Sequence, residues 1–268
     1  MLKARIITAL FLASGLLAAL FLLPRLGSVA AFTAIVAIAA WEWAGLLKAG
    51  MKARWLFGLA TVLPCAALYF SGMPASLLVA LWYLAVVFWL LLVPAWFRHR
   101  WPLRADAPGF LIGWLLLIPS WAGMVSLQAR SPWLLLAALA LVWVADIAAY
   151  FSGRRFGRHK LAPSISPGKT WEGALGAGLG VLAYAAALGA ATGRLTQFTG
   201  WQILMIGLGL LVLTAVSILG DLFESLAKRQ AGVKDSSTLL PGHGGVLDRI
   251  DSLTSTLPLA GFAALMIA

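Results

Sequence analysis

Long apolar segments recur along this chain and constrain its fold more than any other feature. Each is about 15 to 21 residues long, enough to cross a hydrocarbon layer about 30 Å thick. They lie at about residues 6–23, 29–47, 55–70, 76–97, 109–127, 132–151, 173–192, 201–221 and 253–268. Because backbone groups in lipid must be hydrogen-bonded within the segment, the sequence predicts an all-α, polytopic integral membrane protein with about nine transmembrane helices.

The composition agrees with this prediction. Hydrophobic residues make up 62% of the 268 residues and the mean hydropathy is +0.95, whereas about half of a soluble domain is apolar. Residues 1–268 are therefore expected to form a single transmembrane domain. The one cysteine, Cys65, excludes a disulfide framework and a thiolate metal site. The first apolar segment resembles a secretory signal, but its length and the lack of a clear cleavage site favour a membrane span.

Basic residues are distributed unequally between the two sides that nine spans define. With a cytoplasmic N-terminus, the inner loops hold 17 of the 20 Lys and Arg residues, and only Arg25, Arg130 and Arg194 lie outside. Cytoplasmic loops carry such an excess. It also explains the net charge of +11 without nucleic acid, because the bases occupy short loops rather than one continuous face. Two motif-rich loops, about 152–172 and 222–252, are thus predicted to be cytoplasmic.

Carboxylates are concentrated near the C-terminus, where five of the nine lie within residues 220–252. Asp221, Glu224, Ser225 and Lys228 are spaced so that a helix places all four on one face. Carboxylates at the end of a span are costly unless they are hydrated, paired or bound to a cation. A simple ion pair with Lys228 is the alternative, but it leaves the next carboxylates along the chain unexplained.

A glycine-rich stretch leads to those carboxylates. His243, Gly244 and Gly245 precede Asp248 and Asp251, which share a second helical face. Glycine amides can cradle phosphate oxygens, although an ordinary turn before the last span explains the glycines equally well. Oxygen ligands beside several cations are typical of a hard-metal and phosphate site. The cations are Lys228, Arg229, Lys234 and Arg249.

Two further acids lie within predicted spans, where an ionisable residue indicates a functional role. Asp146 lies in the sixth span, before a basic loop that contains Ser166, Lys169 and Glu172. Such a loop can serve only to orient the protein, and Glu172 can simply favour the start of the seventh helix. Glu42 lies in the second span, where structural hydrogen bonding and a polar cavity are equally good explanations.

Both constellations carry longer motifs. The C-terminal one reads Ser225-x-x-Lys228-Arg229-x4-Lys234-Asp235 and His243-Gly244-Gly245-x-x-Asp248-Arg249-x-Asp251. Upstream, the chain reads Tyr150-Phe151-x-Gly153-Arg154 and Ile165-Ser166-Pro167-x-Lys169-Thr170-x-Glu172-Gly173. Together these motifs resemble those of the phosphatidate cytidylyltransferases, also called CDP-diacylglycerol synthases. One departure is Asp146-Ile147-Ala148-Ala149, where that family more often has Asp-Thr-Gly-Ala.

The resemblance implies that CTP and phosphatidate react to give CDP-diacylglycerol and pyrophosphate, with magnesium and, in some members, potassium. It implies a homodimer in the bacterial inner membrane whose site faces the cytosol. Asp221, Asp248, Lys169 and Lys228 are then expected to be catalytic. The expected metal ligands are Asp221 and Asp248, with Asp251 and Ser225 in support. The expected substrate-binding residues are Asp146, Ser166, Lys169, Lys228, Arg229, Lys234, His243, Gly244, Gly245 and Arg249.

Two other classes of protein remain as alternatives. Acids within spans, namely Glu42, Asp146 and Asp221, also occur in cation-coupled transporters, which show flux without nucleotide turnover. A transporter does not explain the glycine- and arginine-rich loop. Another lipid enzyme, such as a CTP-dependent polyprenol or lipid kinase or a CDP-alcohol phosphotransferase, is the second alternative. The phosphotransferase motif D-G-x2-A-R-x8-G-x3-D-x3-D is absent.

Overall fold

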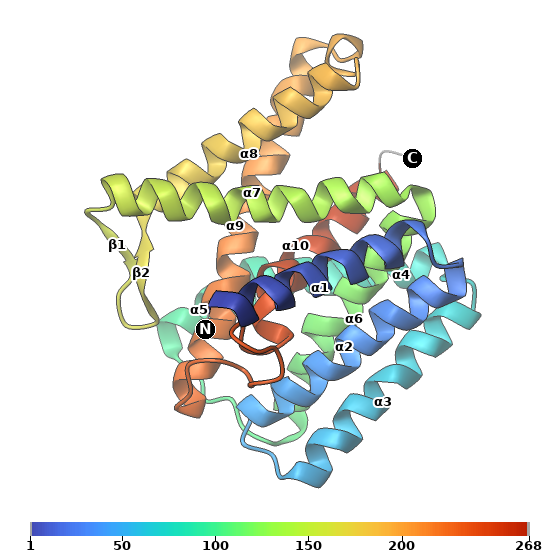
Figure 1. Ribbon diagram of the computed structural model, residues 1–268, viewed down its shortest axis with the longest axis vertical. Coiled ribbons are helices and arrows are strands. Elements are labelled where there is room, and N and C mark those ends of the chain that lie inside the picture. Colours follow the sequence, from blue (N-terminus) through green and yellow to red (C-terminus); the bar gives the residue numbers. More distant parts are fainter. Residues whose placement is uncertain (1, 267–268) are drawn as a thin grey trace.

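The computed structural model describes residues 2–266, with side chains from Arg5 onwards, and it is a bundle of long helices (Figure 1). Each predicted apolar segment falls within or largely overlaps one long helical segment, so the helical fold class is confirmed. The helices are α1 Leu2–Phe21, α2 Arg25–Leu46, α3 Met51–Phe70, α4 Ala75–Val87, α5 Val93–His99, α6 Ala107–Arg130, α7 Pro132–Phe156, α8 Trp171–Ala191, α9 Gly200–Ala231 and α10 Leu247–Met266. A π-helical turn, Phe88–Leu92, joins α4 to α5 without a break.

Seven of these segments in the described part of the chain are long and apolar enough to cross a membrane. They are α2, α3, the continuous α4–α5 segment, α6, α7, α8 and α9. The protein is therefore a multi-pass membrane protein. The described side chains of α1 span Arg5–Phe21, a shorter apolar helix, and α10 does not meet the same standard. For α10 the reason is a run of hydroxyl residues between 252 and 256, all of them buried among neighbouring helices. A helix that protein encloses can be more polar than one that faces lipid.

Helix α10 packs closely enough to bring distant carboxylates together. Its neighbours include α6, α9 and α4. A Cβ atom on Gly220 of α9 would lie 2.8 Å from the backbone oxygen of Asp251, and one on Gly123 of α6 would nearly touch that of Leu257. Only glycine permits such close backbone approach. The carboxylates of α9 and α10 consequently share one end of the bundle.

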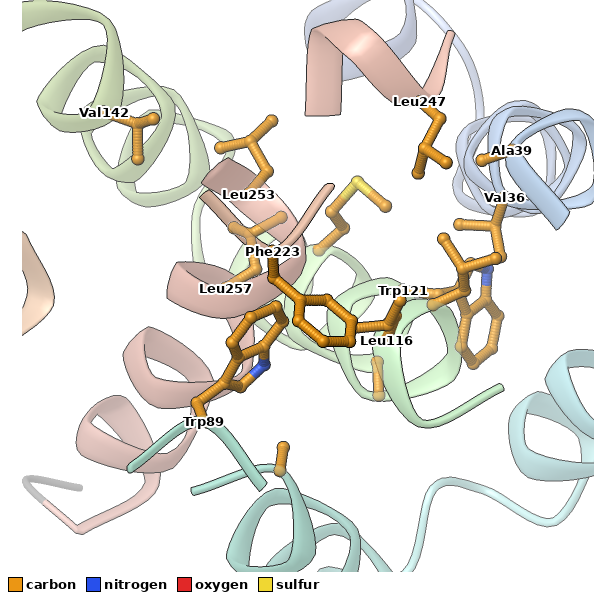
Figure 2. Packing of buried hydrophobic residues seen from close by; sticks show 14 of the residues in the cluster. Val36, Ala39, Trp89, Leu116, Trp121, Val142, Phe223, Leu247, Leu253 and Leu257 are labelled. Atoms are coloured by element: carbon orange, nitrogen blue, oxygen red, sulfur yellow. The ribbon is translucent and has the colours of Figure 1, made fainter. Parts of the chain in front are cut away.

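An aromatic cluster fixes the inner half of α9. Figure 2 shows the Phe223 ring between Trp89 and Leu116. Its centroid lies 5.6 Å from that of Phe88 and 5.9 Å from that of Trp89, and both pairs meet edge to face. Phe223 is fully buried. Because interiors are close-packed, this cluster holds the next residue along the helix, Glu224, in a defined position.

The all-α prediction needs one correction, between α7 and α8. There the chain forms an antiparallel hairpin of β1 Lys160–Ala162 and β2 Ser166–Thr170, beyond the end of α7 in Figure 1. Pro163 and Pro167 prevent this segment from continuing as a helix. At its end, the Thr170 hydroxyl accepts a hydrogen bond of 3.1 Å from the Gly173 amide and starts α8. The hairpin thus delivers Ser166 and Lys169 to a fixed place.

Candidate active site

The two sequence constellations meet in one cavity of about 450 Å³, here called the carboxylate cavity. Its polar lining includes Asp146 from α7, Ser166 and Lys169 from β2, and Asp221 from α9. Lys169 Nζ lies 2.7 Å from Asp221 Oδ2, and the Ser225 hydroxyl donates to Asp221 Oδ1 at 3.2 Å. Asp221 and Lys169 remain partly accessible, at 31% and 23% of their side-chain surface. The structure thus brings residues from both sequence constellations into one cavity.

Charge in and around this cavity is concentrated. Asp146, Asp221 and Asp251 lie close enough for their charges to repel one another. Lys169 and Arg249 are near enough to Asp146 to attract its charge. Carboxylates held this close favour the binding of a cation. The apolar side of the cavity, which includes Leu161, completes a pocket suited to an amphiphilic anion.

Glu224 and Asp248 form a separate, buried cluster with Lys228. Lys228 Nζ lies 2.6 Å from both Glu224 Oε2 and Asp248 Oδ1. Asp248 Oδ2 accepts hydrogen bonds from the amides of Ser236 and Gly245 at 2.8 and 2.7 Å, and from the Ser236 hydroxyl at 2.9 Å. The Lys228 and Asp248 side chains are only 13% and 4% exposed. The oxygens of Asp248 are thus occupied by protein donors rather than directed into an open site.

Glu42 anchors this cluster from the second helix, and it is fully buried. Its carboxylate accepts from the amides of Val246 and Leu247 at 3.0 and 2.6 Å and from the Ser237 hydroxyl at 2.5 Å. The Ser236 hydroxyl, 3.3 Å away, is shared between Glu42 and Asp248. Because Val246 and Leu247 begin α10, Glu42 also places negative charge at a helix N-terminus. Structural hydrogen bonding is therefore the correct one of the two explanations for this residue.

We call Glu42, Glu224, Lys228, Ser236 and Asp248 the inner network. Sequence reasoning did not place Glu42, Glu224 or Ser236 among the site residues. For the two glutamates a signal existed, because an acid within or at the end of a span needs a partner. Ser236 carries no such signal. Gly245 packs against Ser236 and Glu42, and a Cβ atom on it would collide with the Ser236 hydroxyl and the Glu42 carboxylate.

The glycine-rich loop forms a third region, a loop cavity of about 570 Å³ lined in part by Lys234, His243, Gly244 and Arg249. Gly244 has a φ of +80°, which favours glycine, and a Cβ atom there would lie 2.7 Å from Asp248 Oδ2. The turn explanation of the glycines therefore holds, and the same turn lines a cavity that also contains Lys234 and Arg249. Arg249 connects this cavity to the first through its proximity to Asp146.

Arg229 is placed differently from the other predicted phosphate ligands. Its Nε donates to the backbone oxygen of Ile165 at 3.4 Å, on the other side of the hairpin from Ser166. It lines a further cavity with Ser164 instead of the carboxylate cavity. The predicted site residues therefore divide among four places. The first cavity is lined by Asp146, Ser166, Lys169 and Asp221, with Ser225 and Asp251 beside it. The inner network includes Lys228 and Asp248, to which the amide of Gly245 donates a hydrogen bond. The loop cavity is lined by Lys234, His243, Gly244 and Arg249, and Arg229 lies apart.

No preformed metal cage exists among the described residues, because no three His, Cys, Asp or Glu side chains there are arranged to hold an ion. Asp221 and Asp248 each face a lysine instead of each other. The donor chemistry of Asp146, Asp221 and Asp251, though not their present arrangement, suits a hard cation. These three carboxylates repel one another, and hard cations prefer oxygen ligands.

Comparison with known proteins identifies the family of this chain. Residues 3–267 match the family described as "Cytidylyltransferase family". A Pseudomonas aeruginosa protein named phosphatidate cytidylyltransferase is 42% identical over 278 aligned residues, which cover 100% of this chain and 98% of that relative. A Haemophilus influenzae protein of the same name is 35% identical over 98% of each chain. By the match of its whole length, this chain belongs to the cytidylyltransferase family.

Proposed function

We propose that this protein is a phosphatidate cytidylyltransferase of a bacterial inner membrane. It transfers CMP from CTP to phosphatidate and yields CDP-diacylglycerol and pyrophosphate. Family membership and the names of two full-length relatives support the reaction. The observation that carries the site is the carboxylate cavity, where Lys169 and Asp221 meet 2.7 Å apart beside Asp146 and Ser166.

The lipid substrate fits the carboxylate cavity. Its phosphate would bind Lys169 and Ser166, and its glycerol and acyl portions would lie toward the apolar wall and the exposed Tyr150 of α7. An ionised phosphate monoester is already a nucleophile, so no strong general base is needed. One of its oxygens forms a bond to the α-phosphorus of CTP, while the bond from that phosphorus to the β-phosphate oxygen breaks.

The nucleotide fits the loop cavity, whose cations Lys234 and Arg249 would neutralise the triphosphate and the leaving pyrophosphate. Reactants of this kind bring together about six negative charges, so positioning and neutralisation should supply most of the rate enhancement. Arg249, close to Asp146, lies where the two substrates would meet. The N-terminal Arg5 adds a further cation to this cavity.

Magnesium is the proposed cofactor, held by Asp146, Asp221 and Asp251. When bound, it would neutralise phosphate charge and polarise the α-phosphate. Ser225 would orient Asp221 through its hydrogen bond. We assign Asp248 and Lys228 to positioning, because protein groups already occupy their polar atoms. For a potassium ion as second cation we propose Glu224 Oε1 as a ligand, a buried oxygen without a hydrogen-bond partner in the described structure.

The transporter alternative loses one of the three acids on which it depends. The carboxylate of Glu42, the one acid of α2, accepts hydrogen bonds from the loop and from the start of α10. It therefore does not line an ion pathway.

A homodimer would bury the exposed apolar face of α8 and the start of α9, which extends away from the other helices in Figure 1. Leu175, Leu179 and Trp201 lie on that face.

The decisive experiment uses the purified protein in detergent with phosphatidate, radiolabelled CTP and magnesium. A labelled CDP-lipid and one equivalent of pyrophosphate are expected. Phosphorylation of a lipid alcohol, or uptake by proteoliposomes without nucleotide turnover, would replace the proposal by one of the alternatives.

Nine spans with a cytoplasmic N-terminus are part of the proposal, and cysteine labelling tests them. Thr238 in the loop and Thr196 between α8 and α9 are both exposed. In a Cys65→Ala background, an impermeant thiol reagent should label Thr238→Cys only from the cytoplasmic side and Thr196→Cys only from the other. Labelling of both positions from one side would refute this topology.

A further inference from the structure

The structure contains a strongly cationic cavity that the proposed reaction does not use. It measures about 590 Å³. Its cations are Lys48 after α2, Arg100 and Arg104 between α5 and α6, and Arg229 at the end of α9. We call it the cationic cavity. Among the described residues, no Asp or Glu lines it.

The four cations of this cavity have no counter-charge in the described structure. The ion pairs found there involve Lys169, Lys228 and His159 only. Arg100 donates a hydrogen bond of 2.8 Å to the Ser164 hydroxyl, which holds its guanidinium against the hairpin. A concave surface lined by one sign of charge focuses its field and concentrates counter-ions. The arrangement is therefore suited to an anion from solution or from the membrane surface.

Two helix C-termini meet at this cavity. Lys48 (φ +62°) follows the end of α2 and Arg100 (φ +51°) caps α5. A left-handed residue at such a position is a common helix cap, and positive charge is favourable there. The two caps thus direct cations from separate helices to one cavity.

We propose that the cationic cavity is a second phosphoanion site, distinct from the carboxylate cavity. Arginine matches phosphate geometry, and several cations from separate loops can contact one phosphate or diphosphate group. The hairpin is the wall between the sites, with Ser164 and Ile165 facing one cavity and Ser166 and Lys169 the other. The ligand is a phosphate-bearing anion, either free in the cytosol or as the headgroup of an anionic lipid.

Inorganic pyrophosphate is the probe, titrated calorimetrically into full-length protein in metal-free buffer, with Lys234→Gln/Arg249→Gln in every protein compared so that the loop cavity does not contribute. Lys48→Gln/Arg100→Gln should weaken its binding at least tenfold. The matched control is Lys52→Gln/Arg98→Gln, which removes two cations from the ends of α3 and α5 next to the same two connections; neither residue lines the cavity. It should bind within about twofold of wild type. Equal weakening by both double variants, or by neither, would overturn the proposal.

Two further arms distinguish the source of the phosphate and separate this site from the reaction. Protein in phosphatidylcholine nanodiscs is compared with protein in nanodiscs that also contain phosphatidylglycerol. Weaker pyrophosphate binding in the anionic discs, seen in wild type but not in Lys48→Gln/Arg100→Gln, assigns the site to a lipid headgroup. Unchanged binding assigns it to a free phosphoanion. Asp221→Asn should retain pyrophosphate binding even where cytidylyl transfer is lost, so failure of either proposal is visible alone.

Discussion

The carboxylate cavity and the inner network contain similar residues but differ in how their polar atoms are used. Each has a lysine paired with an aspartate, Lys169 with Asp221 and Lys228 with Asp248. The first pair is about a quarter to a third exposed and lines a cavity, whereas the second is almost fully buried and hydrogen-bonded on every side. The difference teaches that one motif can supply both reacting groups and the groups that position them.

Removal of divalent metal is expected to have the largest effect. Dialysis against EDTA should abolish CDP-lipid formation, because without the metal ion the carboxylates near Asp221 repel the nucleotide phosphates. Added magnesium should restore it, as measured with radiolabelled CTP. Full activity after exhaustive dialysis would remove the metal from the carboxylate cavity and leave Lys169 as its main phosphate ligand.

The two lysines offer the most direct test of the comparison. Lys228→Met leaves Glu224 and Asp248 buried without their cation, which should cost about 3–5 kcal/mol of folding free energy. Lys169→Met leaves the partly exposed carboxylate of Asp221 without its cation and should cost only about 0–1 kcal/mol of folding free energy. It should nevertheless abolish most activity. Thermal unfolding in detergent, followed alongside turnover, measures both. Equal melting temperatures for the two variants would erase the distinction between the regions.

Asp221→Asn should lower turnover at least about a hundredfold, which corresponds to about 2.7 kcal/mol of transition-state stabilisation. The substitution keeps the side-chain volume but removes an anionic metal ligand, so stability should change little. Asp106→Asn is the matched control, because Asp106 only caps α6 through a hydrogen bond of 2.9 Å to the Gly109 amide, and Asn is an equally good cap. Near-normal transfer by Asp221→Asn would contradict its role.

Glu42→Gln should have the smallest effect on turnover among the variants that test the two regions. An amide presents one oxygen instead of two to the amides of Val246 and Leu247, so about 1.5–3 kcal/mol of charge-assisted hydrogen bonding is at risk. We expect a lower melting temperature and a higher magnesium concentration for half-maximal activity, because the start of α10 carries Asp251. A melting temperature that falls while the magnesium requirement stays fixed would limit Glu42 to folding.

Local patterns in the sequence predicted the helices and much of the site. Apolar length located each long helix, since backbone hydrogen bonds within a helix depend on local sequence. The i, i+3, i+4 and i+7 spacing correctly placed Asp221 and Lys228 on one helix. The spacing did not show that Lys228 turns toward Asp248 while Asp221 turns toward Lys169. That choice depends on which neighbouring helix lies against each part of α9.

The sequence by itself determined the membrane fold, the family and most of the residues that gather at one end of the bundle. Hydropathy and motif spacing are local, so they survive in a linear string. Tertiary structure alone decided that Asp248 is saturated by Ser236, Gly245 and Lys228, that Glu42 crosses from the second helix to hold α10, and that Arg229 faces away from the carboxylate cavity. The contacts of Glu42 join residues far apart in the chain, and those of Asp248 depend on how the loop folds back on α9 and α10, so close packing rather than any local pattern selects them.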